Sequence, residues 1–416
     1  MTAQRAPLDP ALAALLDLRR EWYGMPRGFY QTEALYGAEM RQVWQAGWLF
    51  AGFEIELPKP GDYITFAVDS TPVLVLRGDD GQVRAFHNVC RHRGTQLCRA
   101  ESGHLRAIVC PYHSWTYARS GELRSCHGMH EGVDKSQLGL KPIHATVVAG
   151  LVYVCLADEP PSVEGLRSDF LSAGGPQGFD RAKIAHVVDY EVQANWKLVW
   201  ENNRECFHCV PCHPQYVKAN FDIVDEATAS AAVKQKIEAA NARIAGKWTT
   251  AAAESLHLHG GLATFPDPQR GLWFASSRTP MTEGFVSESM DGSRVAPLMG
   301  DYDDEEVGVL RMRSLPNFWV HASCDHAVAA RMLPSGPRTT RMRGYWLVDA
   351  KAQEGTDYQL DKMLPFWHLT NEQDWNICKW QQKGVDSIAY EPGPLSQRLE
   401  YNLDAFIRWY IAQMRS

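Results

Sequence analysis

The sequence predicts an α+β fold in two parts, an N-terminal all-β domain followed by a larger domain that mixes strands and helices. From Trp48 to Leu156, short segments rich in β-branched residues alternate with turn residues. Beyond this region, segments with helical periodicity appear among further strands. The chain has 416 residues, which is longer than one typical domain. We expect N-terminal helices over 1–47 that pack on the second domain, a β domain over 48–158 and an α+β domain over 159–416.

Charge and hydropathy exclude several classes of function. Lys and Arg number 42 and Asp and Glu 49, so the net charge is −7, which argues against nucleic-acid and anionic-membrane partners. No run approaches the roughly 20 apolar residues of a membrane span. The opening residues lack the apolar stretch of a signal peptide. We therefore expect a cytoplasmic protein whose ten cysteines are thiols, metal ligands or core residues.

The elements can be assigned in chain order. Residues 10–46 carry two short helical patterns, and the Gly-, Ser- and Pro-rich stretch 161–180 predicts a linker. Residues 194–208 predict one helix, and the Ala-rich residues 225–245 predict a surface helix. The expected strands are DYITFAV, PVLVLRG, QVRAFHNV, GLVYVCL, AHVVDYEVQ, GLWFASS, NFWVHAS, HAVAARML and RMRGYWLVDA, and the last two expected helices are TNEQDWNICKWQQKGV and QRLEYNLDAFIRWYIAQM.

Four residues in the β domain form the pattern C-x-H-x17-C-x2-H, namely Cys90, His92, Cys110 and His113. Two thiolates can hold one iron of a [2Fe–2S] cluster, and two imidazoles can hold the other iron. Because the imidazoles are neutral, they raise the reduction potential of the cluster. The alternatives are buried structural side chains or a Cys2His2 zinc site, although zinc sites usually pair C-x2–4-C with H-x3–5-H. Three other thiols are expected in the core or in loops: Cys98, Cys126 and Cys155.

A second group of metal-ligating types lies in residues 195–214. Glu201, Glu205 and His208 are spaced i, i+4 and i+7, which places them on one face of a helix. We expect Pro211 to end that helix, so that the chain folds back and His213 reaches the same metal as His208. Two histidines and one carboxylate with open positions form the facial triad of non-haem Fe(II) oxygenases.

The carboxylate of this triad is expected from a distant helix. Thr370 and Gln373 have the spacing of a capping box, which predicts a helix start. Asp374 then shares an apolar stripe with Cys378, where a carboxylate is costly unless it is paired or binds metal. We therefore choose Asp374 as the third ligand. The alternatives are a solvated helix-start Asp374, or a ligand role for Glu372 or Asp386.

A rival interpretation takes Cys206, Cys209, Cys212 and His213 as a zinc knuckle. The pattern C-x2-C-x2-C-H crowds four ligands into eight residues, with no second loop to close a tetrahedron. A structural role for the three thiols is favoured instead.

These motifs, with the flanking HRG and HSW, resemble those of the Rieske non-haem iron oxygenases over roughly Trp48 to the C-terminus. The resemblance implies a [2Fe–2S] Rieske cluster, a mononuclear Fe(II), O2 as co-substrate, a helix-grip-like catalytic domain with an antiparallel sheet, and a homotrimer. The chain has no flavin, nicotinamide or C-x4-C-x2-C motif. NAD(P)H is therefore expected to act only indirectly, through a separate flavin- or ferredoxin-type reductase.

In the family, an acid that is usually Asp links an iron-ligand His to a cluster His of the neighbouring subunit. The matching residues here are His208 and His113, with Glu205 as the inter-subunit electron-transfer bridge. Glu in place of Asp departs from the ring-hydroxylating dioxygenases. It resembles the branch that oxidises quaternary ammonium compounds, namely the glycine betaine and proline betaine (stachydrine) demethylases and carnitine monooxygenase. ENNRECFHC and NEQDW most resemble the betaine demethylases.

The implied reaction is hydroxylation of an N-methyl group, with release of formaldehyde and the demethylated amine. The alternatives are a carnitine-type C–N cleavage, an aromatic-ring dioxygenase, or an electron carrier without oxygenase activity. A small cationic substrate is best bound by aromatic faces. Phe318 and Trp319 are the substrate residues chosen, from a wider group that also includes Trp248, Trp273, Phe274, Tyr345 and Trp346.

Overall fold

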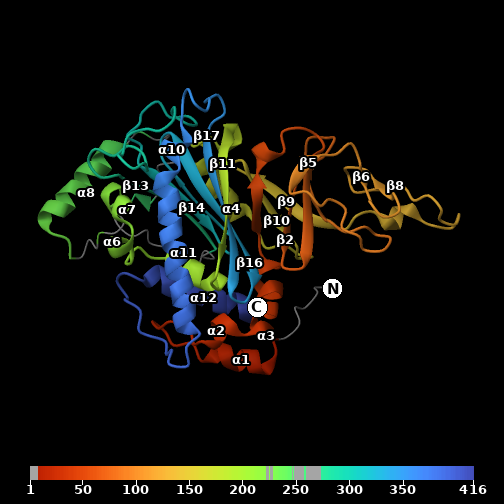
Figure 1. Ribbon diagram of the computed structural model, residues 1–416, viewed down its shortest axis with the longest axis horizontal. Coiled ribbons are helices and arrows are strands. Elements are labelled where there is room, and N and C mark those ends of the chain that lie inside the picture. The colour runs from red at the N-terminus through yellow and green to blue at the C-terminus, as the bar shows by residue number, and fades with distance from the viewer. Residues whose placement is uncertain (1–7, 222–223, 225–227, 246, 248–256, 259–272) are drawn as a thin grey trace.

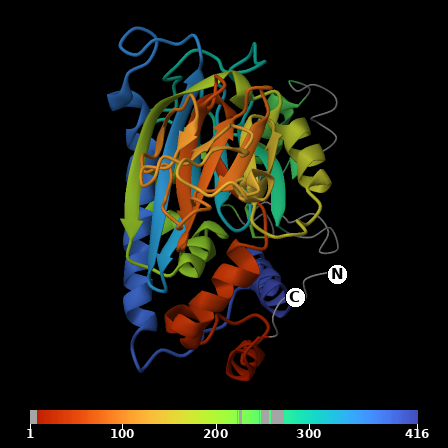
Figure 2. The ribbon, with the colours of Figure 1, turned by 90° about the vertical axis from the view of Figure 1, so that its right-hand side faces the viewer.

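The computed structural model describes residues 8–221, 224, 228–245, 247, 257–258 and 273–416 (Figure 1). Two large β-sheets lie side by side, and a layer of helices lies below them (Figures 1 and 2). This arrangement confirms the predicted α+β class. None of the described helices has the length and apolar character needed to cross a bilayer. The cytoplasmic location expected above stays a prediction.

The N-terminal domain is built on a sheet with the strand order β1-β10-β9-β4-β3-β2-β5. All neighbouring pairs in it are antiparallel, and the four strands predicted from the sequence are present. Its inner strand β3 is apolar on both faces, because Val73 and Val75 enter one core and Leu74 and Leu76 another. The strands are β1 (Leu49–Phe53), β2 (Asp62–Val68), β3 (Thr71–Arg77), β4 (Val83–His87), β5 (Ser102–His104), β9 (Pro142–Val148) and β10 (Leu151–Cys155).

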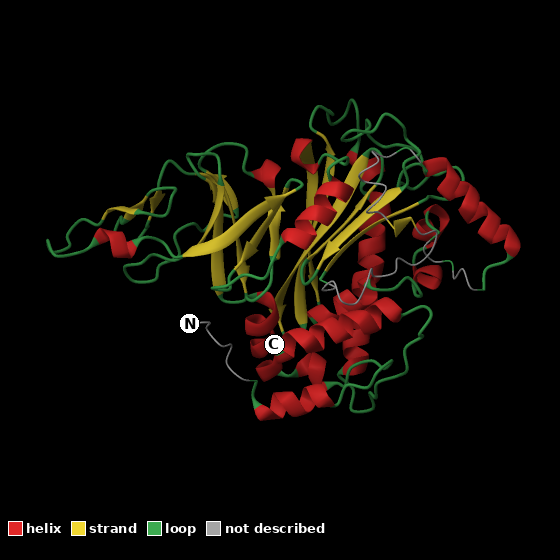
Figure 3. Cartoon of the chain, turned by 180° about the vertical axis from the view of Figure 1, so that it is seen from behind, coloured by secondary structure: helices red, strands yellow, loops and turns green. Residues whose placement is uncertain are grey.

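A three-stranded sheet extends from this domain to one end of the molecule, on the right in Figure 1 and on the left in Figure 3. It consists of β6 (Ile108–Val109), β7 (Thr116–Tyr117) and β8 (Leu123–Ser125). Its buried side chains belong to a separate core that also contains Leu74 and Phe86 of the large sheet. The small sheet is therefore anchored to the large one, although its outer loops are exposed.

The second domain is built on a sheet with the order β11-β17-β16-β15-β14-β13-β12. Its neighbouring pairs are antiparallel except for β12 with β13. Alternation along β15 sends Phe318 and Val320 into the core beneath one face, while Trp319 and His321 point to the other face. The strands are β11 (Ala182–Val192), β12 (His257–Leu258), β13 (Phe274–Thr279), β14 (Val309–Ser314), β15 (Phe318–Ala322), β16 (His326–Gly336) and β17 (Thr339–Asp349).

The predicted linker over 161–180 is wrong, because α4 (Glu164–Gly174) occupies most of it. Leu166, Phe170 and Ala173 follow helical spacing and are fully buried, and α4 contacts β13 and β14. The Pro and Gly residues that suggested a linker lie mainly at or beyond the ends of this helix. Because of these Pro and Gly residues, the short apolar stripe of α4 was not recognised in the sequence.

The N-terminal helices pack against the C-terminal helix below the sheets (Figures 1 and 2). Buried Glu39 joins them to the second domain: it accepts hydrogen bonds from Trp196 Nε1 at 2.8 Å and Tyr410 OH at 2.6 Å, and it pairs with Lys197. These helices are α1 (Pro10–Asp17), α2 (Gly28–Gln31), α3 (Glu33–Glu39), which continues as a π-helical turn over Met40–Trp44, and α12 (Tyr401–Arg415).

The remaining helices flank the second sheet. The helix expected over 225–245 is α8 (Ala231–Ile244), which lies at the surface and buries one narrow edge, Ile237, Ala240 and Ile244. The others are α5 (Trp196–Asn203), α6 (Cys209–Cys212), α7 (Pro214–Ala219), α10 (Leu360–Met363) and α11 (Pro365–Val385).

Candidate metal centres and substrate cavity

Two loops with the same backbone pattern present the first group of residues. In one, Cys90 N–H donates to Thr95 O at 2.8 Å and Gly94 N–H donates to Cys90 O at 3.0 Å. In the other, Cys110 N–H donates to the Trp115 carbonyl at 2.8 Å and Ser114 N–H donates to Cys110 O at 3.0 Å. The residue four positions after each Cys has a positive φ, 76° at the Gly and 57° at the Ser. The two loops are thus matched supports for one Cys and one His each.

The side chains on these loops fit a Rieske-type cluster. Cys90 and Cys110 are buried, and the rings of His92 and His113 lie with their centroids 4.7 Å apart. His92 stacks on Trp115 at 4.8 Å, and its Nδ1 is buried without a hydrogen-bond partner among the described residues. A buried imidazole nitrogen normally has a partner, and a metal ion would supply it here.

Tyr117 connects the two loops, a contact that the sequence did not indicate. Its hydroxyl accepts a hydrogen bond from Arg91 N–H at 3.0 Å and lies 3.3 Å from Cys90 Sγ. Either atom can donate in this contact, and the hydroxyl would be the donor when Cys90 is the thiolate that a cluster requires. A hydrogen bond to a cluster sulfur stabilises the reduced, more negative state.

The second group of residues does not lie on one continuous helix, so the helical-face prediction is wrong. Helix α5 ends at Asn203, and the chain turns before α6 begins. Glu205 supports this turn, because its carboxylate accepts the N–H groups of Phe207 and His208. Glu201 points elsewhere and accepts a hydrogen bond from Tyr30 OH at 2.7 Å.

The predicted role of Pro211 is wrong as well. It lies inside the short helix α6, where a missing N–H in the first turn costs no hydrogen bond. The chain breaks two residues later, at His213, with φ −126° and ψ 69°, and Pro214 begins α7. This break turns the His213 side chain back toward His208.

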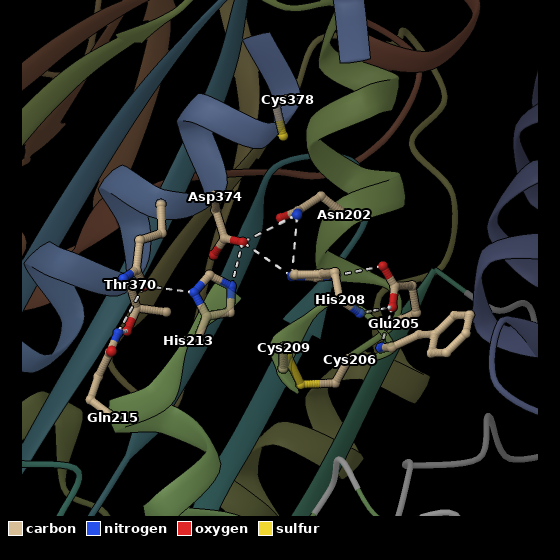
Figure 4. Close-up of polar contacts among 12 residues, drawn as sticks. Asn202, Glu205, Cys206, His208, Cys209, His213, Gln215, Thr370, Asp374 and Cys378 are labelled. Carbon is tan, nitrogen blue, oxygen red and sulfur yellow. Dashed lines mark hydrogen bonds and ion pairs between the residues drawn. A yellow bond between two sulfur atoms is a disulfide. The ribbon is translucent and has the colours of Figure 1, made fainter. Parts of the chain in front are cut away.

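The structure brings His208, His213 and Asp374 together (Figure 4). Asp374 Oδ1 lies 3.2 Å from His208 Nε2 and 2.9 Å from His213 Nε2. The opposite ring nitrogens are held by other side chains: His208 Nδ1 is 2.6 Å from Glu205 Oε1, and His213 Nδ1 is 2.8 Å from Gln373 Oε1. Each ring is therefore oriented with Nε2 toward a common point, as metal-ligating histidines are.

The capping-box prediction for Thr370 and Gln373 is wrong, because both lie within α11. Thr370 donates to Phe366 O at 2.7 Å along the helix. Gln373 instead belongs to the site, where it accepts from His213 and, at 3.0 Å, from Gln215 Nε2. The only sequence feature that could have indicated the two glutamines is their nearness to candidate ligands, since Gln373 precedes Asp374 and Gln215 follows His213 by two positions.

Asn202 is a further group that the sequence did not single out. Its Nδ2 lies 3.1 Å from Asp374 Oδ1 and 3.3 Å from His208 Nε2 (Figure 4). It therefore joins α5 to α11 at the point where the two side chains meet.

Electrostatics keep the carboxylate of this site ionised. Burial works to raise the pKa of Asp374, but hydrogen bonds from His208 and His213 outweigh it and hold the pKa below its usual value. Burial works to lower the pKa of His208, but its bonds to Asp374 and Glu205 raise it to about 10. Two oriented imidazoles and an anionic carboxylate fit a divalent iron that keeps open coordination positions.

The zinc-knuckle alternative is contradicted by a disulfide between Cys206 and Cys209 (Figure 4). Cys209 Sγ lies within 4.8 Å of ligand atoms on His208 and His213, but a disulfide sulfur is no thiolate ligand. Cys212 remains a free thiol.

His208, His213 and Asp374 line a cavity of about 120 Å³. Trp319 lines it, but Phe318 does not: that ring packs at 4.5 Å from Phe50, where the two large sheets meet. Trp248 lies outside the described residues, and the other aromatic candidates from the sequence are absent from the wall that the structure describes. Three aromatic residues of the wall were not foreseen: Tyr216, Trp367 and Trp375.

Two family models match this chain. Residues 47–141 match the Rieske [2Fe-2S] domain, and residues 179–416 match the ring hydroxylating alpha subunit (catalytic domain). The chain is 38% identical to the glycine betaine monooxygenase oxygenase subunit of Chromohalobacter salexigens, over 99% of this chain and 91% of that protein. It is 36% identical to the subunit of the same name from Pseudomonas aeruginosa, over 98% and 94%.

Solved structures share the fold. The quaternary ammonium Rieske monooxygenase CntA in complex with L-carnitine has a TM-score of 0.68 at 20% identity, covering 96% of this chain and 98% of that one. Naphthalene 1,2-dioxygenase from Rhodococcus has a TM-score of 0.63 at 18% identity, covering 98% and 99%. The chain carries both the cluster domain and the catalytic domain, and its relatives include glycine betaine monooxygenase oxygenase subunits. It therefore belongs to the Rieske non-haem iron oxygenases, as an alpha-type subunit.

Proposed function

We propose that this chain is the oxygenase component that hydroxylates an N-methyl group of a betaine-type quaternary ammonium compound. The observation that carries the proposal is the cavity, which joins His208, His213 and Asp374 to an aromatic wall. A permanent cation has no N–H to donate, so aromatic faces are its best protein partners, at roughly 0.5–2 kcal/mol each. The names of the two glycine betaine relatives support the same substrate class.

The residues divide the work between them. Cys90, Cys110, His92 and His113 would hold the cluster, and His208, His213 and Asp374 would hold the iron. When bound, these groups store an electron and activate O2. Glu205 and Gln373 keep the two iron-site rings aligned. Trp319 and the other aromatic residues of the wall exclude water from the cation and turn one methyl group toward the histidines.

The reaction balances with an external electron source. The substrate N–CH3, O2, two electrons and two protons give N–CH2OH and water. The C–N bond of the hydroxymethyl product then breaks, its electron pair stays on nitrogen, and formaldehyde, the tertiary amine and one proton leave. The electrons come from a separate reductase, because an oxygenase subunit of this family has one as a partner.

A homotrimer with Glu205 at the subunit interface is part of the proposal. The three-stranded sheet and α6 lie on opposite sides of the molecule (Figure 1), so one chain does not bring its own two sites together. Apolar side chains are exposed at both ends, Val109 and Tyr112 near the cluster loops and Phe207 and Val210 near Glu205. Contact between these patches would place His113 of one copy beside Glu205 of the next.

The test is an assay with a surrogate reductase and three substrate types, namely glycine betaine, carnitine and an arene. We expect O2 uptake with glycine betaine, and one formaldehyde and one dimethylglycine for each O2 consumed. Trimethylamine from carnitine would show the C–N cleaving alternative, and a cis-diol would show a ring dioxygenase. O2 uptake without formaldehyde or dimethylglycine from any betaine would overturn the proposal.

A further inference from the structure

Three arginine side chains stand in the wall of the cavity that holds the candidate iron site: Arg204, Arg311 and Arg313. Arg204 follows α5 directly and is only 3% exposed. Arg311 and Arg313 alternate along β14, so both point to the cavity face of the sheet. Three guanidinium groups around one small, largely buried space favour an anion there.

The strand register pairs these cations with the aromatic wall. Arg313 lies opposite Trp319 in the antiparallel pair of β14 and β15, and Arg311 lies opposite His321. Trp319 is held from behind by Trp200, with centroids 5.1 Å apart. One face of the sheet therefore offers a surface for a quaternary ammonium group directly beside a surface for an anion.

The arginines differ in their surroundings. Arg311 donates to Asn220 Oδ1 at 3.0 Å, and Asn220 Nδ2 donates to Glu288 Oε1 at 3.1 Å, so a buried carboxylate stands behind Arg311. Burial, then the charge of Arg313, lower the pKa of Arg204, while Tyr401 acts to raise it. Burial lowers the pKa of Arg313 to about 10, against the opposing effects of Tyr401 and Asp169, which leaves Arg313 charged at neutral pH. An anion near Arg204 and Arg313 would be attracted by both guanidinium charges.

The chemistry of the iron site supplies a reason for such an anion site. A divalent iron with one carboxylate and two neutral imidazoles carries a net positive charge, which repels a quaternary ammonium group. The aromatic wall offsets part of this repulsion, and a second anchor on the substrate would offset more. A guanidinium is the side chain best suited to a carboxylate, because it can donate two parallel hydrogen bonds.

We propose that Arg204 and Arg313 bind the carboxylate of the substrate, so that the enzyme selects zwitterionic betaines over quaternary ammonium compounds with an uncharged tail. This inference rests on the function proposed above and narrows its substrate class. The aromatic wall recognises the trimethylammonium group, and the arginine pair recognises the other end. Choline shares the first group and lacks the second.

The test measures binding without turnover, by calorimetric titration of the purified protein. The ligands are glycine betaine, its uncharged methyl ester and choline, which share one trimethylammonium group. We expect the wild type to bind glycine betaine at least about tenfold more tightly than the other two, since a charge-assisted hydrogen bond is typically worth that much. In Arg313→Gln, glycine betaine should lose roughly 10- to 100-fold in affinity while choline changes little.

Further variants sharpen the result. Arg204→Gln should also weaken the binding of glycine betaine. Arg313→Lys should lose less affinity for glycine betaine than Arg313→Gln, because lysine keeps the charge although it cannot donate two parallel hydrogen bonds. Arg181→Gln is the matched control, because Arg181 forms a surface pair with Asp301 at 2.8 Å. Thermal melting and the visible spectrum of the cluster report folding of each variant. Where the Gln variants do not fold, Arg313→Lys and the three ligands on the wild type decide.

The outcomes separate the two proposals. Equal binding of choline and glycine betaine by the wild type, or equal losses for both in the folded Arg313 variants, would overturn the carboxylate site and leave the proposed function standing. No binding of any of the three ligands would overturn the proposed function itself. A loss specific to the carboxylate ligand supports both.

Discussion

The two candidate metal centres are built in opposite ways. The cluster residues stand on two neighbouring loops with the same backbone hydrogen bonds, and the His113 end is exposed. The iron residues come from segments 161 positions apart, His213 and Asp374, and their orientation depends on side chains such as Gln373 and Asn202. A site held by backbone tolerates changes around it, whereas a site held by side chains depends on each neighbour.

The largest effect is expected from removing an iron ligand. Asp374→Ala, His208→Ala or His213→Ala should reduce the iron content from three to two per chain and abolish oxygenation, while the visible and EPR spectra of the cluster remain. The two sites share no residue, so their losses should separate. Iron analysis beside the cluster spectrum is the measurement. Full iron and activity in Asp374→Ala would transfer the ligand role to Glu372 or Asp386.

The next effect concerns the reduction potential of the cluster. His113→Cys or His92→Cys replaces a neutral imidazole by an anionic thiolate, which should lower the potential by on the order of hundreds of millivolts. Iron at the second site should stay bound. Redox titration followed by EPR measures this, with His127→Ala on the same domain as the control. An unchanged potential in both Cys variants would show that the imidazoles are not ligands.

A moderate effect is expected at Glu201, which lies one turn before the iron-site loop but outside it. Burial raises its pKa to about 7, above the usual value for Glu. Between pH 4.5 and 7 the folded state therefore retains a proton that the unfolded state has lost, and stability falls as pH rises through this window. Glu201→Gln should thus be more stable at pH 8 by roughly 1–3 kcal/mol, with little difference at pH 4. Melting at both pH values measures it, and the same difference at both would contradict the assignment.

The smallest effect is expected from the link between the cluster loops. Tyr117→Phe removes the hydrogen bond to Cys90 Sγ, which should lower the reduction potential by on the order of tens of millivolts without loss of iron. The shift should add to that of His113→Cys if the two groups act independently. A potential that rises, or a cluster that is lost, would mean that Tyr117 holds the loops together rather than tuning the sulfur.

The same contrast explains what could be predicted from the sequence. The spacing of Cys90, His92, Cys110 and His113 is visible because each ligand pair sits on one short loop. Asn202, Gln215 and Gln373 resemble any polar residue near a helix, and only the tertiary fold brings them to His208 and His213. The end of α5 was missed because the apolar period continues to Phe207, while Glu205 breaks the helix by accepting backbone N–H groups.

The aromatic residues show a second limit. Phe318 and Trp319 are adjacent in the sequence, yet they point to opposite faces of β15, and only Trp319 lines the cavity. The strand itself was predicted, but its register against the core was not. Tyr216 and Trp367 were missed because they come from helices that the sequence did not place over the sheet.

The central claim is that two separately built centres cooperate through Glu205, which holds His208 and is proposed to lie at the interface with a neighbouring copy. Glu205→Gln keeps the size of the side chain and removes its charge. Single-turnover re-oxidation of the pre-reduced cluster by O2, with substrate present, tests this most directly. We predict that the variant keeps three irons per chain and a reducible cluster, yet re-oxidises far more slowly than the wild type. Re-oxidation at the wild-type rate would contradict the claim and leave Glu205 as a support for the loop alone.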